Sequence, residues 1–398
     1  MIIAADHKKN KLFDRLLLKI YGLYFILFPF YLWRSGLPQI ADIVMVMIIV
    51  LYLYRTRATL RRPIHLKLIT RIAVIFFLHI TLINTTWMLL LNTTESFWLP
   101  TFFYLYNISV FLITISLYCD YREQLLATIL KSIVVSLVVQ LSTYLFGGGF
   151  AGGRMVLGFN NPNQLGYYSL ITAGIILLTS KRIKINIWWF LVGLFASLIL
   201  CLASLSKASI VSYAFMLGAH IAWTHPDKIF KRRLIALVVI LGVSLVLIYT
   251  YTDYLANNHL INAVIRRMDS IGKDSDDSLE GRGYDRIWKY PQYWIFGAGE
   301  GGYIRFDQNM EFHSTLGNIQ VSYGIIGLTL FLALLFLVIK VDEYQSIYIV
   351  AAMLLYGLTH NGIRNSMFWI LLVLVSVRDS KSAQYLQGEP IGMVKNGD

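Results

Sequence analysis

Long apolar runs, separated by short polar or basic breaks, recur along almost the whole chain. A run of about 20 apolar residues is what a helix needs to cross the hydrocarbon core of a bilayer. Only SLSK separates the seventh run from the eighth, so roughly ten to thirteen spans are compatible with the pattern. The pattern predicts an all-α, polytopic membrane protein with about 12 transmembrane helices, at 16–33, 37–54, 72–91, 97–118, 125–146, 162–179, 186–204, 206–224, 234–253, 319–339, 344–359 and 363–377.

One hydrophilic segment interrupts this pattern. It divides the chain into a bundle of about nine spans at 1–253, a loop at 254–318, a bundle of about three spans at 319–377, and a tail at 378–398. The loop holds nine aromatic residues between positions 284 and 312. Because long loops without structure of their own are uncommon in compact proteins, we expect a packed, mainly helical cap.

The composition agrees with a membrane protein. Of the 398 residues, 57% are hydrophobic and 14% are Asp, Glu, Lys or Arg, whereas a soluble domain carries about 25% charged residues. This balance excludes a multi-domain soluble enzyme, because so few charged side chains cannot cover a water-facing surface. The two cysteines, Cys119 and Cys201, lie at or within apolar runs and do not suggest a disulfide framework.

The basic residues are distributed unevenly between the two sides of the predicted membrane. With a cytoplasmic N-terminus, the inner segments hold 22 Lys and Arg residues, whereas the short outer loops hold four. Such an excess is the positive-inside signal of membrane proteins. It predicts that both termini are cytoplasmic and that the 254–318 loop is extracytoplasmic, and it explains the net charge of +13 without nucleic-acid binding. The first apolar run is too long for a signal peptide and is interpreted as an uncleaved span.

Two short motifs in the loop suggest ligand sites that their context does not favour. GAGEGG at 297–302 matches a dinucleotide-binding pattern, which requires a strand and a helix of a parallel sheet on either side. A tight turn that brings the backbone close to a neighbour is favoured instead. DSDDSLE at 274–280 is acidic, but Leu279 occupies the position where a calcium loop needs glycine. A solvated acidic turn is favoured there, and we expect no metal or cofactor.

Basic residues are also expected at the outer membrane face, beside these turns. Guanidinium groups bind phosphates through paired hydrogen bonds, so several around one cleft could hold a diphosphate head group. The alternative for each residue is ordinary anchoring at the membrane interface. Glu300, in the glycine-rich turn, is also a candidate substrate-binding residue. The basic candidates are Arg154, Lys207, Arg282, Arg286, Arg305 and Arg364.

His313, in EFHSTLGN, lies where the loop joins the tenth predicted span. An imidazole titrates near neutral pH, so His313 could accept a proton from a sugar hydroxyl. The alternative is a structural histidine. No other His, Cys, Asp or Glu lies at metal-ligand spacing from it, so the sequence does not support a metal site. Glu300 and Glu311 are the next candidates for a general base.

Five stretches, in a consistent order, carry a resemblance to a known family. They are GLPQIAD (36–42), RMVLGFNNPNQLG (154–166), SLSKAS (204–209), GRGYDRIWKYPQYWIFGAGEGGY (281–303) with EFHSTLGNIQVSYGIIG (311–327), and THNGIRNSMFW (359–369). Together they resemble the bacterial O-antigen polymerases and O-antigen ligases, polytopic inner-membrane enzymes of surface polysaccharide assembly. The resemblance implies a large outer loop between late spans and metal-independent chemistry on sugars linked to undecaprenyl diphosphate.

The resemblance also implies roles for individual residues. Arg282 matches the family's loop arginine and His313 its loop histidine, which makes these two the candidate catalytic residues. Lys207 stands where many relatives carry arginine, which keeps the charge but loses the planar fork. Arg286 falls where relatives often carry tryptophan or an apolar residue, and is interpreted as a substrate-specific contact.

The activity implied is that of a Wzy-type glycosyltransferase, which polymerises undecaprenyl-diphosphate-linked oligosaccharide repeats at the periplasmic face of the bacterial inner membrane. Its product would be O-antigen, capsular or exopolysaccharide. The expected partners are the lipid-linked donor and acceptor, membrane lipid, a chain-length regulator and a flippase. An O-antigen ligase, which transfers the finished chain to lipid A core, is the alternative. A transporter of lipid-linked glycans is less favoured, because its spans should carry ionisable residues and repeats, and these spans are nearly free of charge.

Overall fold

The computed structural model describes residues 2–61, 63–92, 95–151, 154–223, 259–273, 278–306 and 311–377. These residues are mostly helical. Within these ranges the only strands are β1 (Phe150–Ala151) and β2 (Arg154–Met155), which pair antiparallel. The helical class predicted from the apolar runs is therefore confirmed.

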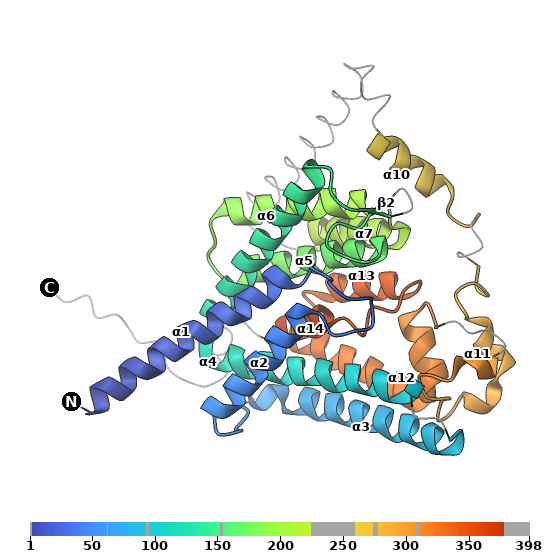
Figure 1. The fold of residues 1–398 in the computed structure, drawn as a ribbon, viewed down its shortest axis with the longest axis horizontal. Coiled ribbons are helices and arrows are strands. Elements are labelled where there is room, and N and C mark those ends of the chain that lie inside the picture. Colours follow the sequence, from blue (N-terminus) through green and yellow to red (C-terminus); the bar gives the residue numbers. More distant parts are fainter. Residues whose placement is uncertain are drawn as a thin grey trace.

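Each predicted span within the described ranges overlaps a helix, although the first was expected to continue to residue 33 and α1 ends at Leu27. The seventh and eighth predicted spans, which only SLSK separates, are two different helices, because one helix ends at Ala203 and the next begins at Lys207. The ninth predicted span at 234–253 and the tail at 378–398 lie outside the described residues. The helices of the bundle, labelled in Figure 1, are α1 (Ile2–Leu27), α2 (Ile40–Arg55), α3 (Lys67–Leu90), α4 (Glu95–Leu145), α5 (Pro162–Arg182), α6 (Ile187–Ala203), α7 (Lys207–Trp223), α12 (Thr315–Val341), α13 (Ile347–Gly357) and α14 (Ser366–Ser376).

Three helical segments are long and apolar enough to cross a membrane, namely Ile64–Leu90, Phe97–Leu145 and Thr315–Val341. The first of these includes the 3₁₀ turn η1 (Ile64–Leu66) that leads into α3. Helices α6, α13 and α14 are shorter but also apolar. These helices identify a membrane protein by length and composition, and the full set of twelve spans stays a prediction.

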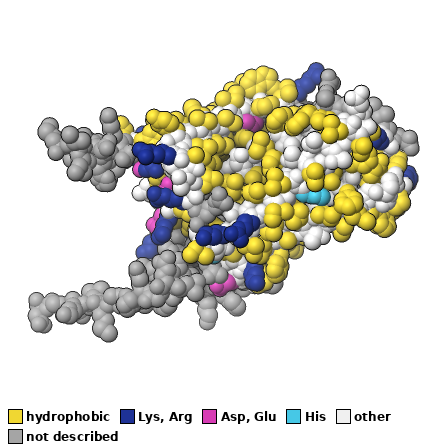
Figure 2. All heavy atoms as spheres, turned by 90° about the horizontal axis from the view of Figure 1, so that it is seen from below, with side chains coloured by type: hydrophobic (Ala, Val, Ile, Leu, Met, Phe, Trp, Pro, Cys, Tyr) yellow, Lys and Arg dark blue, Asp and Glu magenta, His cyan; other side chains and the backbone are white. Residues whose placement is uncertain are grey.

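Large apolar side chains cover much of the outside of the helical bundle. Ile43 on α2, Leu78 and Leu82 on α3, and Leu105 on α4 are all exposed. Figure 2 shows hydrophobic side chains over most of one face, with Lys and Arg gathered mainly toward the end at which Figure 1 places the N-terminus. An apolar surface with charged residues near its end suits a helical bundle surrounded by lipid.

Helix α4 contains two of the predicted spans and bends sharply between them. The bend lies at Arg122, whose backbone angles are φ 37° and ψ −112°. A non-glycine residue with positive φ interrupts the helical hydrogen-bond ladder. The single arginine between the apolar runs 97–118 and 125–146 therefore marks the point where one helical arm ends and the next begins.

Helices α5 and α14 form the centre of the bundle. Every residue from Leu165 to Thr179 and from Ser366 to Ser376 is buried, as expected of helices that are apolar around their whole circumference. Each begins at an asparagine whose side chain accepts a hydrogen bond from the first turn, Asn161 for α5 and Asn365 for α14. The connections that lead into these two helices carry most of the candidate site.

The described residues of the long loop between Tyr284 and Phe312 pack as a small aromatic cap. It contains α11 (Asp285–Lys289), η3 (Pro291–Tyr293) and η4 (Tyr303–Phe306), whereas α10 (His259–Asp269) lies apart from the cap and contacts α6. The buried hydrophobic residues of the cap are Ala298, Phe306 and Phe312 with Val321 of α12, and four tyrosines pack around them. A large extracytoplasmic loop with a mainly helical cap stays a prediction.

Candidate active site

The glycine-rich turn 297–302 joins the cap to a bend in α12. The bend lies at Gly324 (φ 66°, ψ −171°), and the neighbouring carbonyls accept bonds from the turn: Ala298 N to Val321 O (2.8 Å) and Gly299 N to Ser322 O (2.8 Å). A Cβ at Gly297 or at Gly324 would collide with backbone of the other segment. The motif is therefore a close backbone approach, as the sequence favoured, and no parallel sheet surrounds it within the described residues.

Arg305 and Arg286 lie within the packing of the cap. Arg305 donates hydrogen bonds to the carbonyls of Ala298, Gly301 and Gly302, and its guanidinium lies 4.8 Å from the Trp87 ring centroid. The structure thus gives this candidate phosphate ligand a role in holding the glycine-rich turn.

Arg286 is only 2% exposed, and its guanidinium lies 5.5 Å from the ring centroid of Phe306 and 5.7 Å from that of Phe312. Burial lowers the pKa of this guanidinium. No local pattern in the sequence indicated that Arg286 is buried against Phe306 and Phe312, because these two rings come from other parts of the loop.

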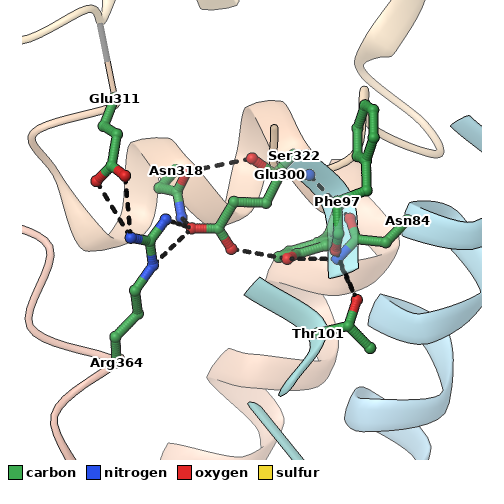
Figure 3. A network of polar contacts seen from close by, with 9 residues as sticks. Asn84, Phe97, Thr101, Glu300, Glu311, Asn318, Ser322 and Arg364 are labelled. Atoms are coloured by element: carbon green, nitrogen blue, oxygen red, sulfur yellow. Dashed lines mark hydrogen bonds and ion pairs between the residues drawn. The ribbon is translucent and has the colours of Figure 1, made fainter. Parts of the chain in front are cut away.

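Arg364 forms a network with two glutamates, shown in Figure 3. Its guanidinium is bonded to Glu300 through two nitrogens, one of them Nε at 3.0 Å, and its Nη1 reaches Glu311 at 3.1 Å. The side chain of Glu300 is fully buried, whereas that of Glu311 is 55% exposed. Two carboxylates therefore already balance the charge of Arg364, which the sequence analysis had assigned to a diphosphate.

The buried carboxylate of Glu300 connects three parts of the fold. It accepts hydrogen bonds from Asn318 (2.9 Å) and Tyr323 (2.7 Å) of α12, and its backbone N–H donates to Asn84 of α3 at 2.9 Å. Arg364 comes from the turn between α13 and α14. We call Glu300, Arg364, Glu311, Asn318 and Tyr323 the Glu300 network. It fixes the glycine-rich turn against the bundle, so Glu300 is a counter-ion here and not an accessible base.

Arg154 on β2 has a different environment. Its Nε donates to Ser204 O (3.1 Å) and its Nη2 to Asn163 Oδ1 (2.9 Å). Both acceptors are neutral, and none of the described carboxylates pairs with it. Burial and the charge of nearby Arg267 lower the pKa of the Arg154 guanidinium to about 10. A half-buried cation beside another cation is suited to an anionic ligand.

The two candidate catalytic residues lie side by side. The backbone N–H of His313 donates to the carbonyl of Arg282 (3.4 Å), and the side chain of His313 is exposed. The guanidinium of Arg282 donates to the Thr359 carbonyl at 2.7 Å. Tyr284, two residues on, bonds to both Ser314 and the Leu358 carbonyl, each at 2.6 Å. These bonds attach the loop to the turn that follows α13.

That turn carries His360, a residue that the sequence analysis did not select. The charges of Arg282, His313 and Arg154 all act on its imidazole. Arg282 is bonded to the residue before His360, and Tyr356, on which the His360 ring stacks, is bonded to Asn163, the residue that also binds Arg154. We call Arg154, Arg282, His313 and His360 the outer basic cluster. His360 lies in the stretch THNGIRNSMFW (359–369), from which the sequence analysis selected only Arg364.

Lys207 begins α7 and contacts the other end of the loop. Its Nζ donates to the carbonyl of Ser270 at 2.8 Å, directly after α10. This α10 also carries Arg267, which lies near enough to Arg154 to act on its charge. Lys207 therefore lies at the margin of the outer basic cluster, where it connects α7 to the loop.

The described residues contain no group of three or more His, Cys, Asp or Glu side chains that could hold a metal ion. No protein-family model and no curated protein matches the chain. The resemblance to O-antigen polymerases and ligases therefore rests on the five stretches in the sequence, and the activity has to be argued from the site itself.

Proposed function

We propose that this protein is a glycosyltransferase that polymerises lipid-diphosphate-linked oligosaccharide repeats at the outer face of the bacterial inner membrane. The observation that carries the proposal is the outer basic cluster. Its arginine charges lie beside the candidate base His313, and Arg154 has only neutral partners among the described residues. Arginine clusters of this kind suit a diphosphate, which accepts paired hydrogen bonds.

In the proposed reaction, His313 removes the proton from a hydroxyl of the acceptor sugar. The oxygen attacks the anomeric carbon of the donor, the bond from that carbon to the diphosphate oxygen breaks, and the electron pair leaves with the lipid diphosphate. Arg154 and Arg282 stabilise the extra negative charge on the leaving group. Electrostatic stabilisation of this kind usually contributes more to catalysis than any other single effect, and a positioned general base adds a factor of about 100 to 10,000.

The proposal is tested with purified protein and a lipid-linked repeat. Polymer should form from the repeat alone, with release of undecaprenyl diphosphate. Formation of product only when lipid A core is supplied would favour the ligase instead. No transfer to either acceptor, by protein that binds the lipid-linked repeat, would contradict both activities.

A deletion strain gives an independent measurement. Loss of a polymerase should leave surface lipopolysaccharide with a single repeat, or remove the capsule. Loss of a ligase should leave lipid-linked polymer that accumulates in the membrane. A wild-type polysaccharide pattern on a gel would contradict the proposed function.

A further inference from the structure

The cap presents an exposed apolar turn at residues 294–296, directly before the glycine-rich turn. The side chains of Trp294, Ile295 and Phe296 are 45%, 58% and 63% exposed. Residues 290–299 include no Asp, Glu, Lys or Arg. Adjacent large apolar side chains on a surface usually mark a place where the protein contacts something apolar. The 294–296 turn is therefore a candidate interaction surface.

Hydrogen bonds attach the 294–296 turn to α12. The carbonyl of Trp294 accepts from the backbone N–H of Ile325 at 2.7 Å and from the side-chain amide of Gln320 at 3.2 Å. Both donors belong to Thr315–Val341, one of the segments that are long and apolar enough to cross a membrane. The turn is therefore fixed against the side of a candidate span.

Helix α3 holds the residues on either side of the turn. The indole nitrogen of Trp87 donates to the Gly297 carbonyl at 2.9 Å, and the Trp87 ring packs edge-on against Tyr293 with centroids 5.3 Å apart. Trp87 lies three residues before the end of a second candidate span, Ile64–Leu90. Two candidate spans therefore determine the position of the turn.

The length of α12 sets the depth of the turn. Its 27 residues extend over about 40 Å, whereas the hydrocarbon core of a bilayer is about 30 Å thick. Ile325 lies ten residues after Thr315, and thus about 15 Å from the start of the helix. Even if the whole surplus of about 10 Å projects on the side of the cap, Ile325 lies about 5 Å inside the hydrocarbon. Trp294, which is bonded to Ile325, shares that depth.

The neighbouring surface and the bonds of Trp294 suit a lipid environment. Ile325 and Ile326, which adjoin the turn on α12, are also exposed, so the turn continues an apolar helix face. Polar groups in lipid have to be satisfied within the protein. The backbone N–H of Trp294 donates to the carbonyl of Pro291 at 3.1 Å, and its indole N–H donates to the carbonyl of Ile287. A tryptophan bonded in this way fits the region where acyl chains meet headgroups.

We propose that the 294–296 turn inserts into the lipid leaflet on the side of the cap, with its three side chains against the headgroup end of the acyl chains. The occupant of this surface is lipid and not a second protein, because the turn continues the lipid-facing side of α12. The inference goes beyond the proposed function and does not depend on it, since lipid contact requires no substrate. Insertion gives the cap an attachment besides the Glu300 network, because the glycine-rich turn that carries Glu300 follows directly in the chain.

The experiment uses single cysteines in full-length protein that carries Cys119→Ala and Cys201→Ala, reconstituted in phosphatidylcholine nanodiscs. Both faces of a nanodisc are open, so the result does not depend on sidedness. Ile295→Cys reports on the turn, Ile325→Cys on the adjoining helix face, and Leu279→Cys on an exposed apolar position of the loop that precedes the cap. The measured quantities are the rate of reaction with a charged thiol reagent, and the quenching of an attached bimane by phosphatidylcholine with a nitroxide on its acyl chain.

We expect Ile295→Cys to react at least about tenfold more slowly than Leu279→Cys, because apolar surroundings raise the pKa of a thiol, and a pKa higher by one leaves about tenfold less thiolate. The lipid nitroxide should quench bimane at Ile295→Cys and Ile325→Cys, and not at Leu279→Cys. Phe296→Cys tests the same turn if Ile295→Cys does not fold.

Two results would overturn the insertion. Equal reaction rates for Ile295→Cys and Leu279→Cys, with quenching only at Ile325→Cys, would place the turn in water. Absence of quenching at Ile325→Cys would contradict the depth from which the insertion is inferred. Neither result concerns polymer synthesis, so the proposed function stands or falls by its own experiments.

Discussion

Arg154 and Arg364 are both arginines of the predicted outer loops, yet the fold places them in opposite electrostatic environments. Arg364 meets two carboxylates, Glu300 and Glu311, so its charge is balanced inside the protein. Arg154 meets a carbonyl and an amide oxygen, and lies near Arg267. A basic residue at a membrane face therefore indicates a site for an anionic ligand only when its hydrogen-bond and ion-pair partners are also known. The Glu300 network stabilises the fold, whereas the outer basic cluster is suited to an anionic ligand.

The largest effect is expected within the outer basic cluster, at His313. His313→Ala should slow polymer synthesis by about 100 to 10,000-fold, because alanine leaves only water to accept the hydroxyl proton. Binding of lipid-linked donor should persist, since Arg154 and Arg282 are unchanged. Both quantities are measured on the same purified protein. Retention of more than about a tenth of the rate would place the general base elsewhere.

Removing the buried carboxylate of the Glu300 network should lower the stability of the protein. Glu300→Gln leaves the guanidinium of Arg364 without its buried counter-ion, and breaking a buried ion pair in this way costs about 3 to 5 kcal/mol of unfolding free energy. Glu311→Gln is the matched control, because its carboxylate is 55% exposed, and exposed pairs contribute about 0 to 1 kcal/mol. Thermal unfolding in detergent compares the two variants. Equal shifts in melting temperature would mean that burial does not distinguish the two carboxylates.

Arg154→Gln tests the other side of the comparison. Loss of its charged hydrogen bonds to a diphosphate should weaken binding of dimethyl diphosphate by about tenfold to hundredfold, since such bonds contribute about 1.5 to 3 kcal/mol each. Arg34→Gln is the control, because Arg34 is an exposed arginine of another predicted outer loop. Calorimetric titration measures both dissociation constants. A decrease of the same size in Arg34→Gln would indicate a diffuse charge effect and no defined site.

Arg282→Lys should have a smaller effect on polymer synthesis, about tenfold, which corresponds to one lost hydrogen bond to a charged group. Lysine keeps the positive charge but cannot bind the Thr359 carbonyl and a phosphate oxygen with one planar fork. The rate is measured at saturating donor, with protein levels matched. A wild-type rate would indicate that Arg282 acts through its charge alone.

The smallest effect on activity is expected from single cysteines that report sidedness. In a Cys119→Ala, Cys201→Ala background, Glu280→Cys in the loop should react with an impermeant thiol reagent in intact spheroplasts. Thr59→Cys, which lies between the second and third predicted spans, should react only after the membrane is permeabilised. The opposite labelling would reverse the predicted orientation, and the outer basic cluster would then face the cytoplasm.

The sequence by itself determined the helices. Every described span overlaps a helix, and even the bend at Arg122 lies between two apolar runs, because the length of an apolar run is a local property of the sequence. The close approach of the glycine-rich turn was also predicted, since glycine is required where a side chain has no room. The identity of the neighbouring segment, the bend of α12 at Gly324, was not.

Only the tertiary structure decided which charges are paired and which are available. Glu300 and Arg364 are 64 residues apart, and Glu300 and Asn84 are 216 apart, so no local pattern relates them. The same holds for the outer basic cluster, where Arg282 is bonded to the carbonyl of Thr359, 77 residues further along the chain. The sequence specifies the charge of a side chain. Its electrostatic environment depends on the groups within a few ångströms, and long-range packing determines which groups those are.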